Sequence, residues 1–250
     1  MRIRVGHLYP EYLNIYADRG NIAVLDRRAA LRGHQFEVRA VGIGDALDPA
    51  AHDLLYIGGG QDREQGLVAP DLVAKGEALH DANARGVAML AVCGGYQLLG
   101  RGYRARDGSV LPGAGLFAHE TVAGDARMIG DVLLECELEP GHREQVAGFE
   151  NHAGRTLLDA GAEPLGRVVH GFGNDGVSGF EGARLGRAIG TYLHGPLLPR
   201  NPWLADWVLS QALAHATGGE PAPLAPLPDE LERDAFRVAA ARARRRGGRR

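Results

Sequence analysis

The stretch that decides the fold is AMLAVCGGYQLLG, residues 88–100. The apolar run over 87–92 is typical of a short strand buried on both faces, and the residues after the two glycines can begin a helix. The glycines must then form the turn between strand and helix. This arrangement places Cys93 at the carboxyl end of the strand, where it is either a nucleophile or a buried thiol.

Apolar runs alternate with helical patterns around this stretch and predict an α/β fold. The pattern is that of a parallel sheet with helices on both faces, in which ligands gather at the carboxyl ends of the strands. Residues 104–185 are rich in glycine and broken into short strands, which predicts a small antiparallel extension. We expect strands over 3–8, 36–41, 54–57 and 187–195, and helices over 21–31, 67–83 and 203–214.

The chain is expected to divide into three parts. Residues 1–216 show no internal repeat or boundary and are predicted to form one domain. Residues 217–228 are rich in proline and are predicted to form a linker. Residues 229–250 begin as a charged helix and end in ARARRRGGRR, over 241–250. Because like charges in a row repel one another and bury nothing, we expect this tail to be solvated and disordered.

The composition limits the class of protein. With 250 residues, 45% of them hydrophobic and 24% charged, the chain has the composition of a soluble globular protein. The formal net charge of -3 combines a basic tail with an acidic remainder, which does not favour a nucleic-acid partner. The two cysteines offer no disulfide framework, no metal-ligand cluster is visible, and the chain starts without a long apolar segment. We therefore expect a cytoplasmic protein that does not insert into a membrane.

The position of Cys93 favours a nucleophile over a buried thiol. A nucleophile on a sharp strand-to-helix turn presents its side chain outward, while the N–H groups of the turn point to where an oxyanion would form. The amino end of the following helix also favours the negative thiolate, which is the reactive form. Cys136 provides the contrast, because in VLLECEL it alternates with Leu134 and Leu138 on one strand face. We assign Cys136 to the core.

A nucleophilic cysteine needs a base and a place for the oxyanion. His194 is the best candidate base, because GTYLHGP delivers it at the end of an apolar strand, on the same edge of the sheet as the cysteine. His152 in ENHAG is the second candidate, whereas His34 and His80 lie in predicted loops or helix ends. The glycines of LLYIGGGQD, residues 54–62, follow another parallel strand and allow the backbone to approach a substrate closely.

Three motifs together resemble a known family. YIGGGQD (56–62), AVCGGYQLLG (91–100) and GTYLHGP (190–196), in this order and spacing, resemble class I glutamine amidotransferase domains of the cobyric acid synthase type. The opening LYPEYLNIYADRGNIAVL (8–25) narrows the resemblance to the glutaminase subunits of lipid II isoglutaminyl synthases. The resemblance covers about residues 1–215 and implies a flavodoxin-like parallel-sheet fold.

The resemblance implies hydrolysis of L-glutamine. Cys93 would attack the side-chain amide carbon, and His194 would take the thiol proton and return it to the departing ammonia. Water would then cleave the thioester. The oxyanion would rest on the backbone N–H groups of Gly94 and of Gly59 in the glycine turn.

Two further residues are implied to bind substrate, and one expected residue is missing. Arg127, in DARMIGD, matches the position where the family holds the substrate, and its guanidinium suits a carboxylate. Gln97 would line the site or support it from behind. Many class I amidotransferases have a glutamate two residues after the histidine, where this chain has Pro196. The histidine therefore works in a dyad, or another acid such as Glu150 or Asp175 orients it.

The sequence has no motif for the ATP-dependent activation of a carboxylate, and this predicts a partner subunit that carries out that step. The chain has no G-x-x-x-x-G-K-[ST] phosphate loop, and its single lysine, Lys75, lies in a helical context. The resemblance implies a heterodimer with a Mur-ligase-like subunit (MurT) that binds ATP and Mg²⁺, so this chain itself needs no cofactor. That partner would activate the α-carboxylate of D-glutamate in the lipid II stem peptide, and ammonia would convert it to D-isoglutamine. The complex would work at the inner face of the cell membrane.

Other functions remain open at this stage. One is a glutaminase subunit that feeds ammonia to a corrinoid or similar acid. Another is a cysteine hydrolase of a related class, which would not release ammonia from glutamine. A third is a binding module in which the thiol of Cys93 is inert.

Overall fold

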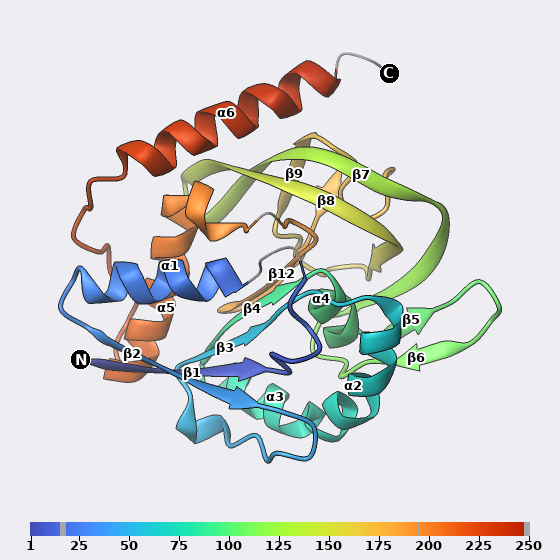
Figure 1. Ribbon diagram of the computed structural model, residues 1–250, viewed down its shortest axis with the longest axis horizontal. Helices are drawn as coiled ribbons and strands as arrows, with labels where there is room; N and C mark the ends of the chain where they lie inside the picture. The colour runs from blue at the N-terminus through green and yellow to red at the C-terminus, as the bar shows by residue number, and fades with distance from the viewer. Residues whose placement is uncertain (16–18, 195, 248–250) are drawn as a thin grey trace.

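The computed structural model describes residues 1–15, 19–194 and 196–247, and these form two six-stranded sheets (Figure 1). The first sheet has the order β11-β12-β4-β3-β1-β2 and is parallel except for the antiparallel pair β11–β12. Strands β3 and β4 are buried along their whole length, as predicted for strands covered on both faces. The strands are β1 (Arg2–Leu8), β2 (Gln35–Val41), β3 (Leu54–Ile57), β4 (Ala88–Val92), β11 (Ala183–Leu185) and β12 (Ala188–Thr191).

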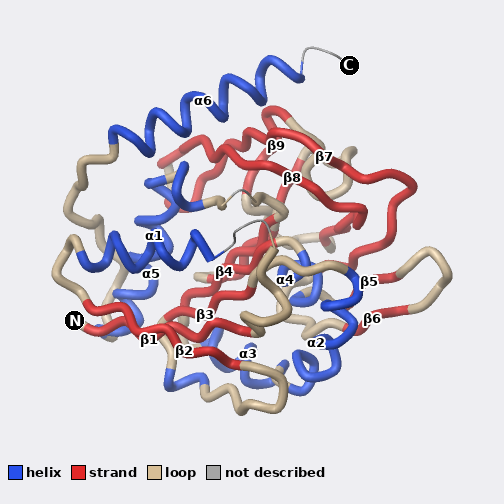
Figure 2. The backbone as a smooth tube through the Cα atoms, in the orientation of Figure 1, coloured by secondary structure: helices blue, strands red, loops and turns tan. Residues whose placement is uncertain are grey.

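Helices cover both faces of this sheet, which confirms the predicted α/β fold (Figure 2). Helices α1 and α5 pack together on one side, and α2, α3 and α4 lie on the other. The helices are α1 (Arg19–Ala30), α2 (Asp62–Ala74), α3 (Gly76–Ala84), α4 (Gly94–Leu99), α5 (Pro202–Thr217) and α6 (Glu230–Gly247), with short 3-10 turns at η1 (Pro49–Ala51) and η2 (Leu198–Arg200).

The single helix expected over 67–83 is wrong, because the chain forms two helices there. Lys75 ends α2 and precedes α3. Its buried ammonium pairs with Asp71 and donates to the carbonyl of Gly42 at 3.3 Å. The polar contacts of this lysine therefore lie at the boundary between the two helices.

The predicted antiparallel extension is the second sheet, with the order β10-β9-β7-β5-β6 and β8 paired to β7. Its long β7–β8 hairpin passes over the carboxyl ends of the first sheet (Figure 1). The register of this hairpin shifts between Ala123 and Met128, so a bulge interrupts β7. The strands are β5 (Gly102–Arg104), β6 (Val110–Pro112), β7 (His119–Glu139), β8 (His142–Leu158), β9 (Gly166–His170) and β10 (Phe180–Glu181).

Helix α6 packs on the outer side of the β7–β8 hairpin (Figure 1). Leu133 and Ala147 of the hairpin form a small apolar cluster with three alanines of the helix: Ala239, Ala240 and Ala243. The helix continues to Gly247, through much of the stretch that we expected to be disordered, because these alanines find an apolar partner. Residues 248–250 lie outside the described residues, and the three-part division of the chain stays a prediction.

Candidate active site

Cys93 occupies a strained turn between β4 and α4. Its backbone has φ 50° and ψ −106°, a conformation that residues other than glycine rarely adopt. The Cys93 N–H donates to the carbonyl of Thr191 at 2.7 Å, so the neighbouring strand β12 holds the turn in place. Strained backbone of this kind is typical of functional sites. The predicted strand-to-helix elbow is therefore present, with the cysteine at its tip.

The amino end of α4 packs directly against the glycine turn that follows β3. A Cβ atom on Gly94 would lie 2.9 Å from the backbone nitrogen of Gly60, so this close approach requires glycine. The Gly95 N–H donates to a carbonyl of the turn at 3.1 Å, whereas the Gly94 N–H belongs to the first turn, which has no acceptor within its helix. Among the glycines of the turn, Gly60 lines the cavity described next, and the predicted Gly59 does not.

A cavity of about 670 Å³ opens beside Cys93, between the start of α2, helix α4 and the β7–β8 hairpin. It contains three of the predicted site residues, Cys93, Gln97 and Arg127, and also the second candidate base His152. In the described part of the chain, no group of three or more His, Cys, Asp or Glu residues could hold a metal ion. The remaining lining residues are Ile15, Gly60, Gln61, Asp62, Arg63, Gln65, Tyr103, Ile129, Asn151, Ala153 and Gly154.

Arg127 projects from the bulged part of β7 and is held by one residue of β8. Its Nε donates to Oδ1 of Asn151 and its Nη2 to the backbone oxygen of Asn151, both at 2.9 Å. These bonds use two of the five N–H donors of the guanidinium. The side chain is therefore oriented while donors remain for an anionic group in the cavity.

Gln97 has protein partners at both ends of its amide. Its Oε1 accepts from Nε2 of Gln65 at 3.1 Å, and its Nε2 donates to the hydroxyl of Tyr192 at 3.1 Å. The Gln65 amide also donates to the carbonyl of Gly60 at 3.2 Å. Gln97 thus connects the glycine turn, helix α4 and the segment after β12, which is a supporting position.

His194 follows the end of β12 by three residues, at the same edge of the sheet as Cys93, but it is not among the described residues that line the cavity. Strand β12 ends at Thr191, which pairs with Val92, so the two chain segments leave the sheet side by side. His194 does not continue the strand as expected. Its N–H donates to the carbonyl of Phe149 at 2.8 Å, which ties it to β8, and its side chain is buried.

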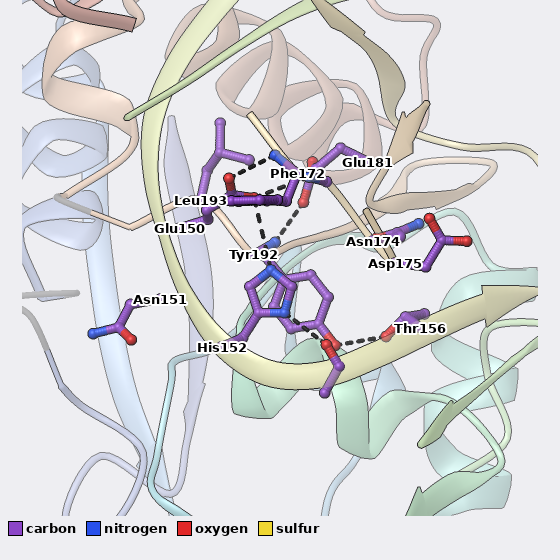
Figure 3. A network of polar contacts seen from close by, with 12 residues as sticks. Glu150, Asn151, His152, Thr156, Phe172, Asn174, Asp175, Glu181, Tyr192 and Leu193 are labelled. Atoms are coloured by element: carbon purple, nitrogen blue, oxygen red, sulfur yellow. Dashed lines mark hydrogen bonds and ion pairs between the residues drawn. The ribbon is translucent and has the colours of Figure 1, made fainter. Parts of the chain in front are cut away.

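His152 lies in the cavity wall and stacks on Tyr192, with ring centroids 3.6 Å apart and an angle of 6° between the planes (Figure 3). Its Nδ1 is 2.8 Å from the carbonyl of Gly154, and its Nε2 is 3.7 Å from Oε2 of Glu150. Nδ1 is therefore the donor toward the carbonyl, and Glu150 stands at the other nitrogen.

The two acids that sequence alone could not place have different roles. Glu150 is buried and accepts from the N–H groups of Phe172 at 2.7 Å and Gly173 at 2.9 Å. Asp175 closes a surface turn, where its Oδ1 accepts from the N–H of Ser178 at 2.8 Å. Figure 3 shows Glu150 directed toward His152 and Asp175 set apart from it.

A second buried carboxylate, Glu181, anchors the segment after β12. It accepts from the N–H of Tyr192 at 2.6 Å and from the hydroxyl of Thr191 at 3.0 Å. Burial raises the pKa of Glu181 to about 8, and the nearby charge of Glu150 acts in the same direction. At neutral pH the protonated form is therefore favoured.

Sequence reasoning missed three residues that organise the cavity: Gln65, Asn151 and Tyr192. Asn151 and Tyr192 lie within the ENHAG and GTYLHGP motifs, next to the candidate bases His152 and His194. Their position near these histidines could have identified them. Gln65 follows the glycine turn by five residues and carried no signal, because its partners come from other parts of the chain.

Together, the fold and this site define a class of α/β protein with a cysteine elbow at the carboxyl edge of a parallel sheet. The CobB/CobQ-like glutamine amidotransferase domain matches residues 4–202, and the chain belongs to that family. The predicted family is thereby confirmed.

Individual relatives are more specific. The chain is 38% identical over 218 residues to the GatD subunit of lipid II isoglutaminyl synthase (glutamine-hydrolyzing) from Streptococcus pneumoniae, covering 87% of this chain and 83% of that one. It is 37% identical over 210 residues to the GatD subunit from Staphylococcus aureus, covering 84% of each. A probable cobyric acid synthase of Methanothermobacter thermautotrophicus is 34% identical over 169 residues, but only 32% of its length is covered.

Solved structures support the fold at low sequence identity. PurLQS from Thermotoga maritima matches with a TM-score of 0.59 and 16% identity, over 87% of this chain and 99% of that chain. A glutamine amidotransferase from the same organism matches with a TM-score of 0.54 and 16% identity, over 96% of this chain and 94% of that one.

Proposed function

We propose that this chain is the glutamine-hydrolysing subunit of a lipid II isoglutaminyl synthase and supplies ammonia to an ATP-dependent partner. The observation that carries the proposal is the strained Cys93 elbow, which opens into a cavity shared with Arg127. The match to GatD subunits over most of both chains supports this choice of subfamily.

The first step forms a covalent intermediate. Sγ of Cys93 attacks the side-chain amide carbon of glutamine. The carbon becomes tetrahedral, and the former carbonyl oxygen carries the negative charge. The N–H of Gly94 and an N–H of the glycine turn receive this negative oxygen. As the resemblance implies, the second donor would be Gly59; its neighbour Gly60, which lies against Gly94 and lines the cavity, is the alternative. Loss of one such donor typically costs about 10²–10³ in kcat.

His194 moves the protons of the reaction. It takes the thiol proton of Cys93 and passes a proton to the leaving nitrogen, so that the C–N bond breaks and ammonia departs. Water then attacks the thioester, which releases glutamate and restores the thiol. Pro196 occupies the usual place of a glutamate, and we assign the proton transfers to His194 and the nucleophilic attack to Cys93.

Arg127 would bind the α-carboxylate of glutamine. Its guanidinium is already oriented by Asn151, and a planar fork pairs well with a carboxylate. Holding the far end of the substrate places the amide at the other end of the cavity, near Cys93.

The partner would be a Mur-ligase-like subunit of the MurT type, which binds ATP and Mg²⁺ and forms a heterodimer with this chain. It would activate the α-carboxylate of D-glutamate in the lipid II stem peptide, and ammonia would convert this group to D-isoglutamine. The complex would work at the cytoplasmic face of the membrane. No helix in the described residues is both long and apolar enough to span a bilayer.

The test separates the ammonia source from the amidation step. In the complex with the Mur-ligase-like partner, Cys93→Ala should abolish glutamine-dependent amidation of lipid II, while added ammonium should restore it. Cys136→Ala is the matched control, because this second thiol is buried in the core and should not be needed for either activity. Failure of ammonium to restore amidation would contradict the division of labour.

A corrinoid-type acceptor is the second candidate, because the family match also includes cobyric acid synthases. Mass spectrometry of lipid II after depletion of the protein distinguishes the two. Loss of the carboxamide from the stem peptide supports the first proposal, and an unchanged stem peptide contradicts it.

A further inference from the structure

Tyr192 lies between the two segments that carry the reaction, but the mechanism above does not use it. It follows β12 directly, two residues before His194, and its side chain is 0% exposed. Its N–H is fixed by Glu181 at 2.6 Å. Whatever holds the Tyr192 side chain therefore also limits where His194 can lie.

The hydroxyl of Tyr192 joins this segment to the helix behind Cys93. It accepts from Nε2 of Gln97 on α4 at 3.1 Å and shares a hydrogen bond with Oγ1 of Thr156 on β8 at 2.6 Å. Burial raises the pKa of Tyr192, so the phenol keeps its proton and serves as donor and acceptor at the same time.

The ring of Tyr192 rests on a supported platform (Figure 3). It stacks on His152, whose Nδ1 donates to the carbonyl of Gly154 and whose Nε2 lies 3.7 Å from Oε2 of Glu150. Glu150 in turn accepts two backbone N–H groups from the loop after β9. The platform therefore cannot shift without breaking several buried polar contacts, which are costly to leave unmade.

This network connects the parts whose separation decides the chemistry. One end reaches α4, which begins immediately after Cys93, and the other continues to His194 through a single residue, Leu193. An error of about 1 Å between reacting groups can cost on the order of 10²-fold in rate. A phenylalanine would fill nearly the same volume but would make neither hydrogen bond of the hydroxyl. The hydroxyl therefore contributes contacts that packing alone does not supply.

We propose that Tyr192 is a positioning residue for glutamine hydrolysis: its hydroxyl and its stacked ring hold the His194 segment at a fixed distance from the Cys93 helix. This inference rests on the proposed function, which assigns the chemistry to Cys93 and His194. Tyr192 itself touches neither the substrate nor the transferred protons.

The test compares two buried tyrosines in the complex with the partner subunit. Tyr192→Phe should lower kcat for glutamine hydrolysis about tenfold and leave KM within about twofold, because the contacts of Arg127 are untouched. Amidation driven by added ammonium should be unchanged. Tyr96→Phe is the matched control, since Tyr96 is also fully buried and its hydroxyl donates to Oδ1 of Asn174 at 3.3 Å. Its kcat should stay within about twofold of the parent.

A second variant removes the same hydrogen bond from the other side. Gln97→Met should lower kcat at least as much as Tyr192→Phe, because it also loses the bond to Gln65. The losses in the double variant should be less than additive, because the two variants share one contact. If Tyr192→Phe does not fold, as judged by thermal unfolding, Thr156→Val carries the test, because Thr156 is the other hydroxyl partner of Tyr192 and does not line the cavity.

The outcomes separate this inference from the proposed function. If the parent complex does not use glutamine, or if Cys93→Ala still does, the proposed function is wrong. If the parent is active through Cys93 but Tyr192→Phe matches Tyr96→Phe, or changes only KM, the positioning role of Tyr192 is wrong. Additive losses in the double variant would also overturn it.

Discussion

Arg127 is an exposed side chain with a fixed direction, and glutamine affinity should depend on it. Arg127→Ala should raise KM for glutamine about 10- to 100-fold, the usual value of a hydrogen bond to a charged group, with kcat changed little. Steady-state kinetics of ammonia release measures both constants. Arg104→Ala is the control, since this exposed arginine pairs with Glu120 and does not line the cavity. An unchanged KM in Arg127→Ala would remove this residue from the substrate site.

Glu181 should make stability depend on pH in an unusual direction for a carboxyl. Its pKa of about 8 in the folded protein lies above the ordinary value of 4.5. The folded state therefore holds the proton longer, and the free energy of unfolding should fall as pH rises between these two values, by about 1 kcal/mol per pH unit. Glu181→Gln keeps an acceptor for the N–H of Tyr192 without a titrating group.

Urea unfolding at a series of pH values checks this expectation. The stability of Glu181→Gln relative to the parent should increase from pH 5 to pH 8 and then stay level. A constant difference across that range would show that Glu181 does not hold its proton more tightly in the folded state.

At the scale of elements, local pattern predicted the first sheet well and the second sheet poorly. β3 and β4 are short apolar runs that belong to buried parallel strands, and the sequence displays this directly. The β7–β8 hairpin spans far more residues than the short strands expected within 104–185. Its bulge and its contacts with the first sheet and α6 are long-range features, which no local period reveals.

The same distinction holds for the site. The Cys93 elbow is local, because strand, glycines and helix follow one another in the chain, and it was predicted. The supporting contacts of Gln97 and Tyr192 join residues 95 positions apart, so sequence alone could not pair them. Which glycine of the turn donates to the oxyanion, the predicted Gly59 or its neighbour Gly60 in the cavity lining, depends on turn geometry that a local pattern does not reveal.

Helix α6 should contribute to stability through its alanine face. Ala240 is buried against the β7–β8 hairpin, so Ala240→Glu would place a charge in an apolar cluster and should lower the free energy of unfolding by about 2–4 kcal/mol. Ala235→Glu on the exposed face of the same helix is the control and should change stability by less than about 0.5 kcal/mol. Equal effects in urea unfolding would mean that α6 is not docked.

At the scale of the whole molecule, the site lies at the seam between the two sheets. Cys93 follows a strand of the first sheet, and Arg127 and His152 belong to the second sheet. His194 follows β12 of the first sheet and pairs with Phe149 of the second. Glutamine bound in the cavity would touch both sheets. The geometry of the reaction therefore depends on how firmly the hairpin is fixed to the parallel sheet.

A buried ion cluster provides one such connection between distant parts of the chain. Arg28 on α1 donates to Asp206 on α5 at 2.7 Å and to Asp229, just before α6, at 2.6 Å. Arg32 also donates to Asp206, at 2.8 Å. Only 5% of the Arg28 side chain is exposed, so its guanidinium has little access to water that could replace these bonds. The cluster therefore anchors the amino end of α6 to the two helices on one face of the parallel sheet.

Arg28→Ala should accordingly destabilise the whole molecule rather than one helix. It leaves two carboxylates close together with a single remaining cation, and removal of one partner from a buried pair typically costs about 3–5 kcal/mol. Urea unfolding followed by circular dichroism should show this loss in one transition, whereas Arg27→Ala, the exposed neighbour on α1, should be nearly silent. A loss below about 0.5 kcal/mol for Arg28→Ala would mean that the cluster contributes nothing net. A separate early transition of α6 alone would mean that the helix is anchored only locally.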